Sequence, residues 1–218
     1  MERIIDTDLL IFDLDGTLID SSEDIAWALN KTLVNLGMKE LPYKEILGYI
    51  GWGVRMLLEQ AIPRDKHHIL DDAIRIFLEF YSGHMLVKTR PYPEVIETLE
   101  YLHRLKKMAV ITNKPYKLTK MILKDLEIDS FFIITLGGDS VRNKKPHPEP
   151  VERVLADLGI PHSRTVFIGD SRIDVETGKC AGILTIGAAY GFRGRKELEE
   201  AGADMIINSF GELKEIIR

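Results

Sequence analysis

The chain has 218 residues, 45% of them hydrophobic and 29% charged, which is the composition of a folded protein with a sizeable core. Its formal net charge of −5 argues against a general nucleic-acid binder, because such a protein needs a basic face for phosphates. The sequence contains no apolar run long enough for a membrane span and no secretory-signal pattern, so we expect a cytoplasmic protein.

Six short apolar runs rich in β-branched residues predict buried strands, because a strand covered on both faces is apolar throughout. The runs are DLLIFD (8–13), MAVIT (108–112), FFIIT (131–135), TVFIG (165–169), ILTIG (183–187) and DMIIN (204–208). Between the later runs, apolar residues recur at helical spacing, for example Leu118, Met121, Ile122 and Leu126. Alternating strands and helices predict an α/β fold with a doubly wound parallel sheet, a Rossmann-like core.

The interval between the first two runs is too long for one crossover connection. Asp13 and Thr112 lie 99 positions apart, whereas a βαβ unit needs about 30 residues. Apolar residues in the interval, such as Ile25, Leu29 and Leu33, have helical spacing, and no stretch has a strand pattern. The sequence therefore predicts a helical cap domain at 18–87, inserted after the first strand into a core made of 1–17 and 88–218.

Polar side chains follow the predicted strands at the edge where open α/β sheets bind their ligands. They are Asp13 and Asp15 after the first run, Thr112 and Asn113 after the second, Lys145 in the loop after the third, and Asp170 and Asp174 after the fourth. Because the carboxyl ends of parallel strands share one edge, we expect all four carboxylates to converge there.

Carboxylates that converge repel one another, and a hard divalent cation removes the conflict. Oxygen ligands without a histidine or thiolate suit magnesium, and a lysine beside hydroxyl and backbone donors suits phosphate oxygens. One carboxylate can attack phosphorus to form an aspartyl-phosphate, and a second can move the proton. The pattern predicts a phosphoryl site, but leaves open which of Asp13 and Asp15 attacks.

Four motifs, DLDGT, TNK, the lysine of KKP, and GDSRID, stand in the order found in the haloacid dehalogenase superfamily, which the chain resembles over its whole length. A helical cap between the first two motifs matches as well. Within this superfamily, GGDSVRNKKPHPEP, GDSRIDVETGKCAG and YGFRG are similar to the bacterial phosphoglycolate phosphatases. The resemblance implies a magnesium-dependent phosphomonoester hydrolase acting on a small anionic phosphoester, with 2-phosphoglycolate as the first candidate.

The resemblance also implies a role for each residue. Asp13 is expected as the nucleophile and Asp15 as the general acid and base, while the metal ligands are expected to be Asp13, Asp15 through its backbone carbonyl, and Asp170. Asp174 would steady this site, and Thr112, Asn113 and Lys145 would hold the phosphoryl group. Lys114 competes with Lys145 for that role, and Lys145 is favoured because the lysine before proline has the family's position.

The predicted cap contains no strong motif that identifies the substrate. Gly51 and Gly53 bracket Trp52 just before a predicted helix, which suggests a loop that approaches something closely. Arg55 could meet a substrate carboxylate there, although an interhelical turn with an exposed arginine explains the same pattern. No interface is evident, so the oligomeric state is not predicted.

Two other functions fit parts of the pattern. A related capped phosphatase or mutase, acting on pyrophosphate or a phosphosugar, would share the core and differ in its cap. A phospho-receiver module also uses acids, a threonine and a lysine, but its phosphoacceptor lies on a middle strand, where this chain has Thr112. The expected partner is a small-molecule phosphoester, with no nucleic acid and no membrane.

Overall fold

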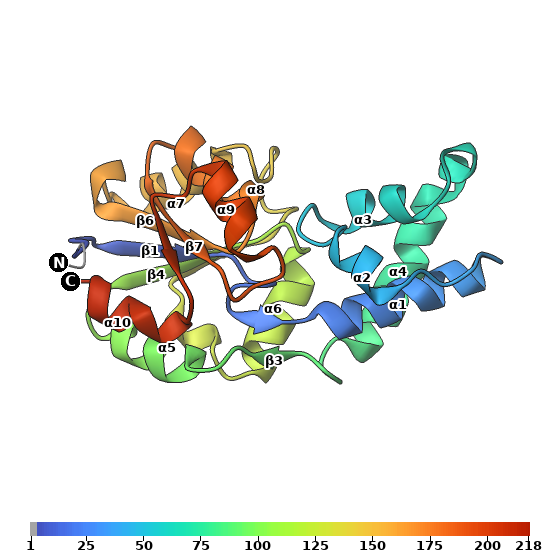
Figure 1. The fold of residues 1–218 in the computed structure, drawn as a ribbon, viewed down its shortest axis with the longest axis horizontal. Helices are drawn as coiled ribbons and strands as arrows, with labels where there is room; N and C mark the ends of the chain where they lie inside the picture. The colour runs from blue at the N-terminus through green and yellow to red at the C-terminus, as the bar shows by residue number, and fades with distance from the viewer. Residues whose placement is uncertain (1–3) are drawn as a thin grey trace.

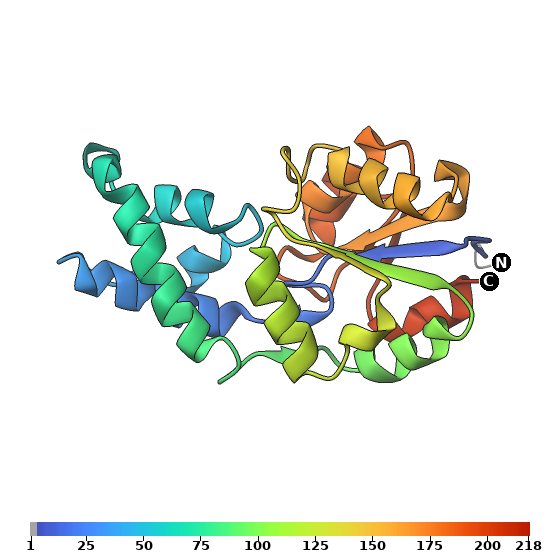
Figure 2. The same ribbon diagram turned by 180° about the vertical axis from the view of Figure 1, so that it is seen from behind.

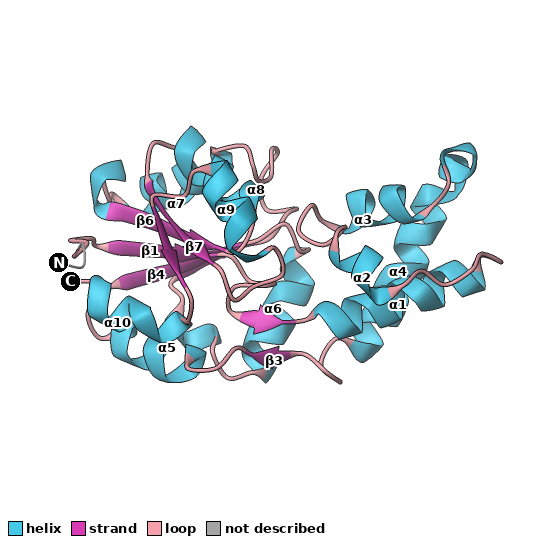
Figure 3. Cartoon of the chain, in the orientation of Figure 1, coloured by secondary structure: helices cyan, strands magenta, loops and turns pink. Residues whose placement is uncertain are grey.

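A computed structural model describes residues 4–218, so residues 1–3 of the predicted core lie outside the described range. The chain forms a larger lobe around a central sheet and a smaller lobe of helices (Figure 1). Figure 3 shows that the strands of the central sheet run toward the smaller lobe, so their carboxyl ends face it. Within the described range, no helix is both long enough and apolar enough for a membrane crossing.

The central sheet has six strands, all paired in parallel, in the order β5-β4-β1-β6-β7-β8. Each overlaps one predicted run: β1 (Leu9–Phe12), β4 (Lys107–Ile111), β5 (Ile134–Leu136), β6 (Thr165–Gly169), β7 (Leu184–Ala188) and β8 (Met205–Ile207). The chain adds β4 and β5 on one side of β1 and then β6, β7 and β8 on the other. This confirms the doubly wound sheet and puts its switch point, where such sheets bind ligands, at the end of β1.

Alternate residues of β1 enter two different apolar cores, because successive side chains of a strand point to opposite faces. Leu10 and Phe12 join the core that extends into the smaller lobe, whereas Leu9 and Ile11 join the smaller core on the other face. All four side chains are fully buried, which explains why the first run is apolar throughout.

Helices cover both faces of the sheet, and Figure 2 shows α5 and α7 on opposite sides of it. They are α5 (Val95–His103), α6 (Tyr116–Asp125), α7 (Glu149–Leu158), α8 (Arg172–Cys180), α9 (Gly194–Ala201) and α10 (Leu213–Ile216). Short 3₁₀ turns complete this lobe at η2 (Asp129–Phe131), η3 (His162–Arg164) and η4 (Phe210–Glu212).

The smaller lobe contains α1 (Ser22–Asn35), α2 (Tyr43–Leu47), α3 (Val54–Ala61), the 3₁₀ turn η1 (Arg64–Ile69) and α4 (Leu70–His84). Helices α1 and α4 pack against each other. The residues predicted to form the apolar face of α1, Ile25, Leu29 and Leu33, are buried. This amphipathic packing holds the lobe together, since each helix buries its apolar face against its neighbours.

Two connections join the lobes and run side by side. The sequence indicates no strand within 18–87, but β2 (Ile19–Asp20) pairs antiparallel with β3 (Arg90–Pro91). The buried carboxylate of Asp24 in α1 fastens the second connection by accepting hydrogen bonds from the backbone N–H of Lys88 (2.9 Å) and of Thr89 (2.8 Å). The prediction of an insertion without strands is therefore wrong at its first residues. The strand β2 forms only through its pairing with β3, and its two residues are too few to show a pattern in the sequence. The domain limits at 18 and 87 remain a prediction.

Candidate active site

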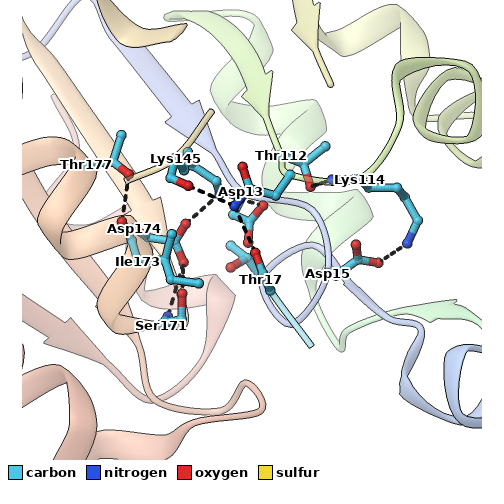
Figure 4. A network of polar contacts seen from close by, with 12 residues as sticks. Asp13, Asp15, Thr17, Thr112, Lys114, Lys145, Ser171, Ile173, Asp174 and Thr177 are labelled. Atoms are coloured by element: carbon cyan, nitrogen blue, oxygen red, sulfur yellow. Dashed lines mark hydrogen bonds and ion pairs between the residues drawn. The ribbon is translucent and has the colours of Figure 1, made fainter. Parts of the chain in front are cut away.

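Most of the predicted site residues lie at the carboxyl edge of the sheet, and Figure 4 shows Asp13, Thr112, Lys145 and Asp174 together there. Asp13 directly follows β1, Thr112 follows β4 and Asp170 follows β6. Asp13 stays in register with the sheet, because its backbone N–H donates to the carbonyl of Ile168 at 2.9 Å. Strand order alone therefore brings residues more than 150 positions apart to one edge.

The turn after β1 requires its glycine. Gly16 has a φ of +88°, a conformation that L side chains rarely adopt. A Cβ at this position would lie 2.3 Å from Oδ2 of Asp170, so no larger side chain fits. The glycine of DLDGT thus lets the first strand's turn pass directly beside the carboxylate at the end of β6.

A buried lysine neutralises part of the acidic edge. Lys145 is 2% exposed, and its Nζ lies 2.8 Å from Oδ1 of Asp13 and 2.6 Å from Oδ1 of Asp174. Burial by itself would lower the pKa of Lys145, but the charges of the two carboxylates raise it above its ordinary value. Lys145 therefore remains an ammonium ion that faces the predicted nucleophile.

Asp13, Asp170 and Asp174 form a buried cluster in which one carboxylate oxygen of each lies within 4.8 Å of the others. Burial, followed by the neighbouring charge of Asp174, raises the pKa of Asp13 to about 7, even though Lys145 opposes the shift. Burial and the same neighbours also raise the pKa of Asp170 well above its usual range. Lys145 alone does not balance three buried acids, and an all-oxygen cluster of this kind suits a hard divalent cation.

Asp174 has most of its oxygen lone pairs committed to the protein. It forms a capping box at the start of α8, where its Oδ2 accepts hydrogen bonds from the backbone N–H of Ser171 (3.1 Å) and its hydroxyl (2.6 Å). Its Oδ1 accepts the hydrogen bond from Lys145. The side chain is thus held rigidly and in turn orients the lysine.

The Asp15 carboxylate lies apart from this cluster, although the sequence predicts that all four acids converge. Figure 4 shows it on the far side of the β1 turn, beside Lys114. Its Oδ1 accepts from Nζ of Lys114 and from Oγ of Ser21, each at 2.5 Å. The turn that leaves β1 sends the two aspartates in different directions, so Asp15 faces the smaller lobe. The expectation of four converging carboxylates is therefore wrong for this one.

The residues after β4 connect three parts of the site. The Asn113 side-chain amide donates to the carbonyl of Lys145 at 3.1 Å and to that of Gly51, in the smaller lobe, at 3.0 Å. Thr112 is buried, and its hydroxyl oxygen accepts from the backbone N–H of Lys114 at 3.2 Å. The predicted phosphate-binding residues are thus next to Asp13 and already oriented by the protein.

The loop formed by residues 48–53 comes close to the core, as its glycines predict. Three core side chains donate to its carbonyls. Besides Asn113, Lys144 reaches the carbonyl of Trp52 at 2.6 Å, and Arg193 reaches those of Gly48 at 3.0 Å and Ile50 at 2.5 Å. Nothing in the spacing of Lys144 and Arg193 along the chain indicates this contact, since it exists only once the two lobes meet.

Arg55 lies away from this contact. Its side chain is 54% exposed and pairs with Asp71 at 2.6 Å and with Glu59 at 4.0 Å. It does not line the cavity between the lobes. The structure thus does not bring Arg55 to the other predicted site residues.

A cavity of about 50 Å³ lies between the lobes, with Asp13 and Asp15 in its wall. The smaller lobe contributes mostly apolar side chains, among them Ile25, Leu57 and Phe77. Tyr81 also lines it, and burial raises the pKa of Tyr81 to about 12, so its hydroxyl keeps its proton at neutral pH. The cavity has room for a group of only a few non-hydrogen atoms.

Comparisons with known proteins agree with this geometry. The sequence profile of the haloacid dehalogenase-like hydrolases matches residues 10–188. A phosphoglycolate phosphatase of Aquifex aeolicus (strain VF5) is 42% identical over 185 residues, 84% of this chain and 85% of that protein. One of Neisseria meningitidis is 38% identical over 94% of this chain and 91% of that protein. The crystal structure of a predicted phosphoglycolate phosphatase from Haemophilus somnus 129PT superposes with a TM-score of 0.90, at 30% identity, over 97% of this chain and 98% of that one.

Proposed function

Because this chain belongs to the haloacid dehalogenase-like hydrolase family, we propose that it is a magnesium-dependent phosphatase that converts 2-phosphoglycolate to glycolate and phosphate. The observation that carries the proposal is the position of Asp13 at the end of β1, in contact with Lys145 and grouped with Asp170 and Asp174. The names of the relatives support the choice of substrate.

In the first step, a carboxylate oxygen of Asp13 attacks phosphorus, and the bond from phosphorus to the ester oxygen breaks. Asp15 donates its proton to that oxygen as glycolate leaves. In the second step, Asp15 takes a proton from a water molecule, and the resulting hydroxide attacks the aspartyl-phosphate and releases phosphate. The separation of the two carboxylates supports this division, because both line the cavity but only Asp13 belongs to the acidic cluster.

A bound Mg²⁺ would neutralise the acidic edge and the phosphoryl oxygens. The residues that would hold it are Asp13, Asp170 and the backbone carbonyl of Asp15, with Asp174 holding Lys145 in place. The raised pKa values of Asp13 and Asp170 support a cation here, since burial makes their ionised forms costly without one.

Thr112, Asn113 and Lys145 would bind the transferring phosphoryl group. The distances support Lys145 over Lys114 for this role, because Lys145 contacts Asp13 whereas Lys114 contacts Asp15. Both lysines are buried, so the contact with Asp13 decides between them.

Residues 18–87 would act as a cap that opens to admit substrate and closes to exclude water. The two connections at β2 and β3 are the proposed hinge. The small cavity in this arrangement of the lobes favours a small leaving group.

A panel of phosphoesters tests the proposal, with 2-phosphoglycolate, pyrophosphate and hexose phosphates assayed for phosphate release with and without Mg²⁺. We expect the highest kcat/KM for 2-phosphoglycolate and loss of release when Mg²⁺ is chelated. Asp13→Asn removes the nucleophile and should abolish turnover, while Lys117→Met, which changes an exposed residue, should not. Undiminished release by the Asp13 variant, or a phosphosugar isomerised without loss of phosphate, contradicts the proposal.

A further inference from the structure

Two polar groups in the cavity wall have no part in the chemistry described above. Lys114 follows Asn113 in the core, and its Nζ lies 2.5 Å from the Asp15 carboxylate and 5.0 Å from the ring centre of Tyr81. Tyr81 belongs to α4 of the cap, and its buried hydroxyl has no hydrogen-bond partner within 3.5 Å in the described part of the chain, while Lys114 lies close enough to influence its pKa. Both side chains are more than nine-tenths buried. A buried hydroxyl with no partner at hydrogen-bond distance is uncommon, and a bound group beside it is one explanation.

We propose that Lys114 and the Tyr81 hydroxyl bind a carboxylate on the leaving group of the substrate, and thereby select acidic over neutral phosphoesters. This inference rests on the proposed phosphatase function. A single methylene group separates the ester oxygen from the carboxylate in 2-phosphoglycolate. Since Asp15 must reach the ester oxygen to protonate it, and Lys114 contacts Asp15, the carboxylate of the same small leaving group comes within reach of the lysine.

The charges around the cavity point to the same group. Among the described residues that line it, Asp13 and Asp15 are acidic and Lys114 is the one cation, and most of the others are apolar. A carboxylate that entered such a cavity without a cationic partner would pay a large desolvation cost. With the Lys114 ammonium and the Tyr81 hydroxyl it would accept two hydrogen bonds.

The two groups also come from different lobes. Tyr81 lies on a cap helix, whereas Lys114 lies in the loop after β4. A carboxylate held by both would therefore stabilise the closed arrangement only when an acidic substrate is present. Arg55, the cap cation that the sequence suggested for this purpose, pairs with Asp71 at the surface instead.

The test compares kcat/KM for 2-phosphoglycolate with that for its neutral amide, 2-phosphoglycolamide, which has the same size and the same ester bond. We expect the wild-type protein to prefer the acid by about 10- to 100-fold, the range of a charge-assisted hydrogen bond. Lys114→Met should reduce this ratio to near one. Any general loss from the altered Asp15 environment affects both substrates and cancels in the ratio. Lys117→Met, which removes an exposed lysine three positions further on, should keep the wild-type ratio.

Tyr81→Phe retains the ring and its packing, so it decides the question even if the Lys114 variant does not fold. We expect it to reduce the ratio by about 2- to 10-fold, as for a neutral donor. A wild-type ratio in either variant overturns the assignment while the proposed function stands. A wild-type protein that fails to hydrolyse 2-phosphoglycolate at all overturns both, so the two failures are distinguishable.

Discussion

Replacement of Lys145 by methionine tests the charge balance of the acidic cluster directly. The Lys145 ammonium lies 2.8 Å from Asp13 and 2.6 Å from Asp174, and it is almost completely buried. Methionine has a similar length but no charge. In the variant, the three clustered carboxylates, including Asp170, therefore lose their cation without the creation of a large cavity.

The expected loss of stability follows from this geometry. Removing one partner of a buried ion pair costs about 3–5 kcal/mol, because the other charge stays buried and unpaired. In a protein of this size, about 1 kcal/mol corresponds to about 2–4 °C in Tm, so Tm should fall by about 6–20 °C. Activity should fall by at least about 100-fold, since the phosphoryl group loses a buried cationic donor.

Thermal unfolding of Lys145→Met, with EDTA and with Mg²⁺, measures the first effect, and kcat on 2-phosphoglycolate at saturating Mg²⁺ measures the second. The loss in Tm should be smaller at pH 5 than at pH 8, because protonation of Asp13, whose pKa is already raised to about 7, relieves the repulsion. Lys117→Met serves as the matched surface control. A variant with the wild-type Tm and kcat would refute the charge-balance reasoning.

Three further predictions address the metal, the turn and the hinge. The pKa of Asp13 is raised from 3.8 to about 7 in the folded protein, so between these pH values the folded state binds a proton that the unfolded state does not. Protonation therefore stabilises the metal-free protein at acidic pH, and this stabilisation is lost as the pH rises through about 7. Because protons compete with Mg²⁺, the gain in Tm on adding Mg²⁺ should be larger at pH 8 than at pH 5, and equal gains would contradict a cation at these carboxylates. Gly16→Ala should lower the apparent Mg²⁺ affinity in activity titrations by at least about 10-fold, because the new Cβ displaces Asp170; an unchanged titration would show that the turn has room. Asp24→Ala should lower the free energy of unfolding in urea by about 3 kcal/mol, because it leaves the N–H and hydroxyl of buried Thr89 without an acceptor, and a change below about 0.5 kcal/mol would mean that water replaces the carboxylate.

Much of the fold could be predicted because its information is local. A strand buried on both faces must be apolar throughout, so Leu9–Phe12 is recognisable from its own residues. The same holds for the helical repeat of Ile25, Leu29 and Leu33. The short strand Ile19–Asp20 could not be predicted, because two residues contain no pattern and only its pairing with Arg90–Pro91 makes it a strand.

The acidic cluster could be predicted in part. Strand ends of a parallel sheet share one edge, and this rule places Asp13 and Asp170 together. It does not give the direction of a side chain within a turn, so Asp15 was expected in the cluster but pairs with Lys114. Ion pairs of this kind depend on the backbone conformation of the turn after the strand, and the alternating pattern of strands and helices in the sequence does not specify that conformation.

The sequence by itself determined the strands of the sheet and which polar residues follow them, because periodicity and strand-end position are properties of neighbouring residues. Only the tertiary structure decided how the two lobes meet. The contacts of Arg193 and Lys144 with the loop at 48–53, the burial of Tyr81 against the cavity and the surface position of Arg55 all join segments distant in the chain. Such contacts depend on the packing of whole helices against the sheet, and no local pattern records that packing.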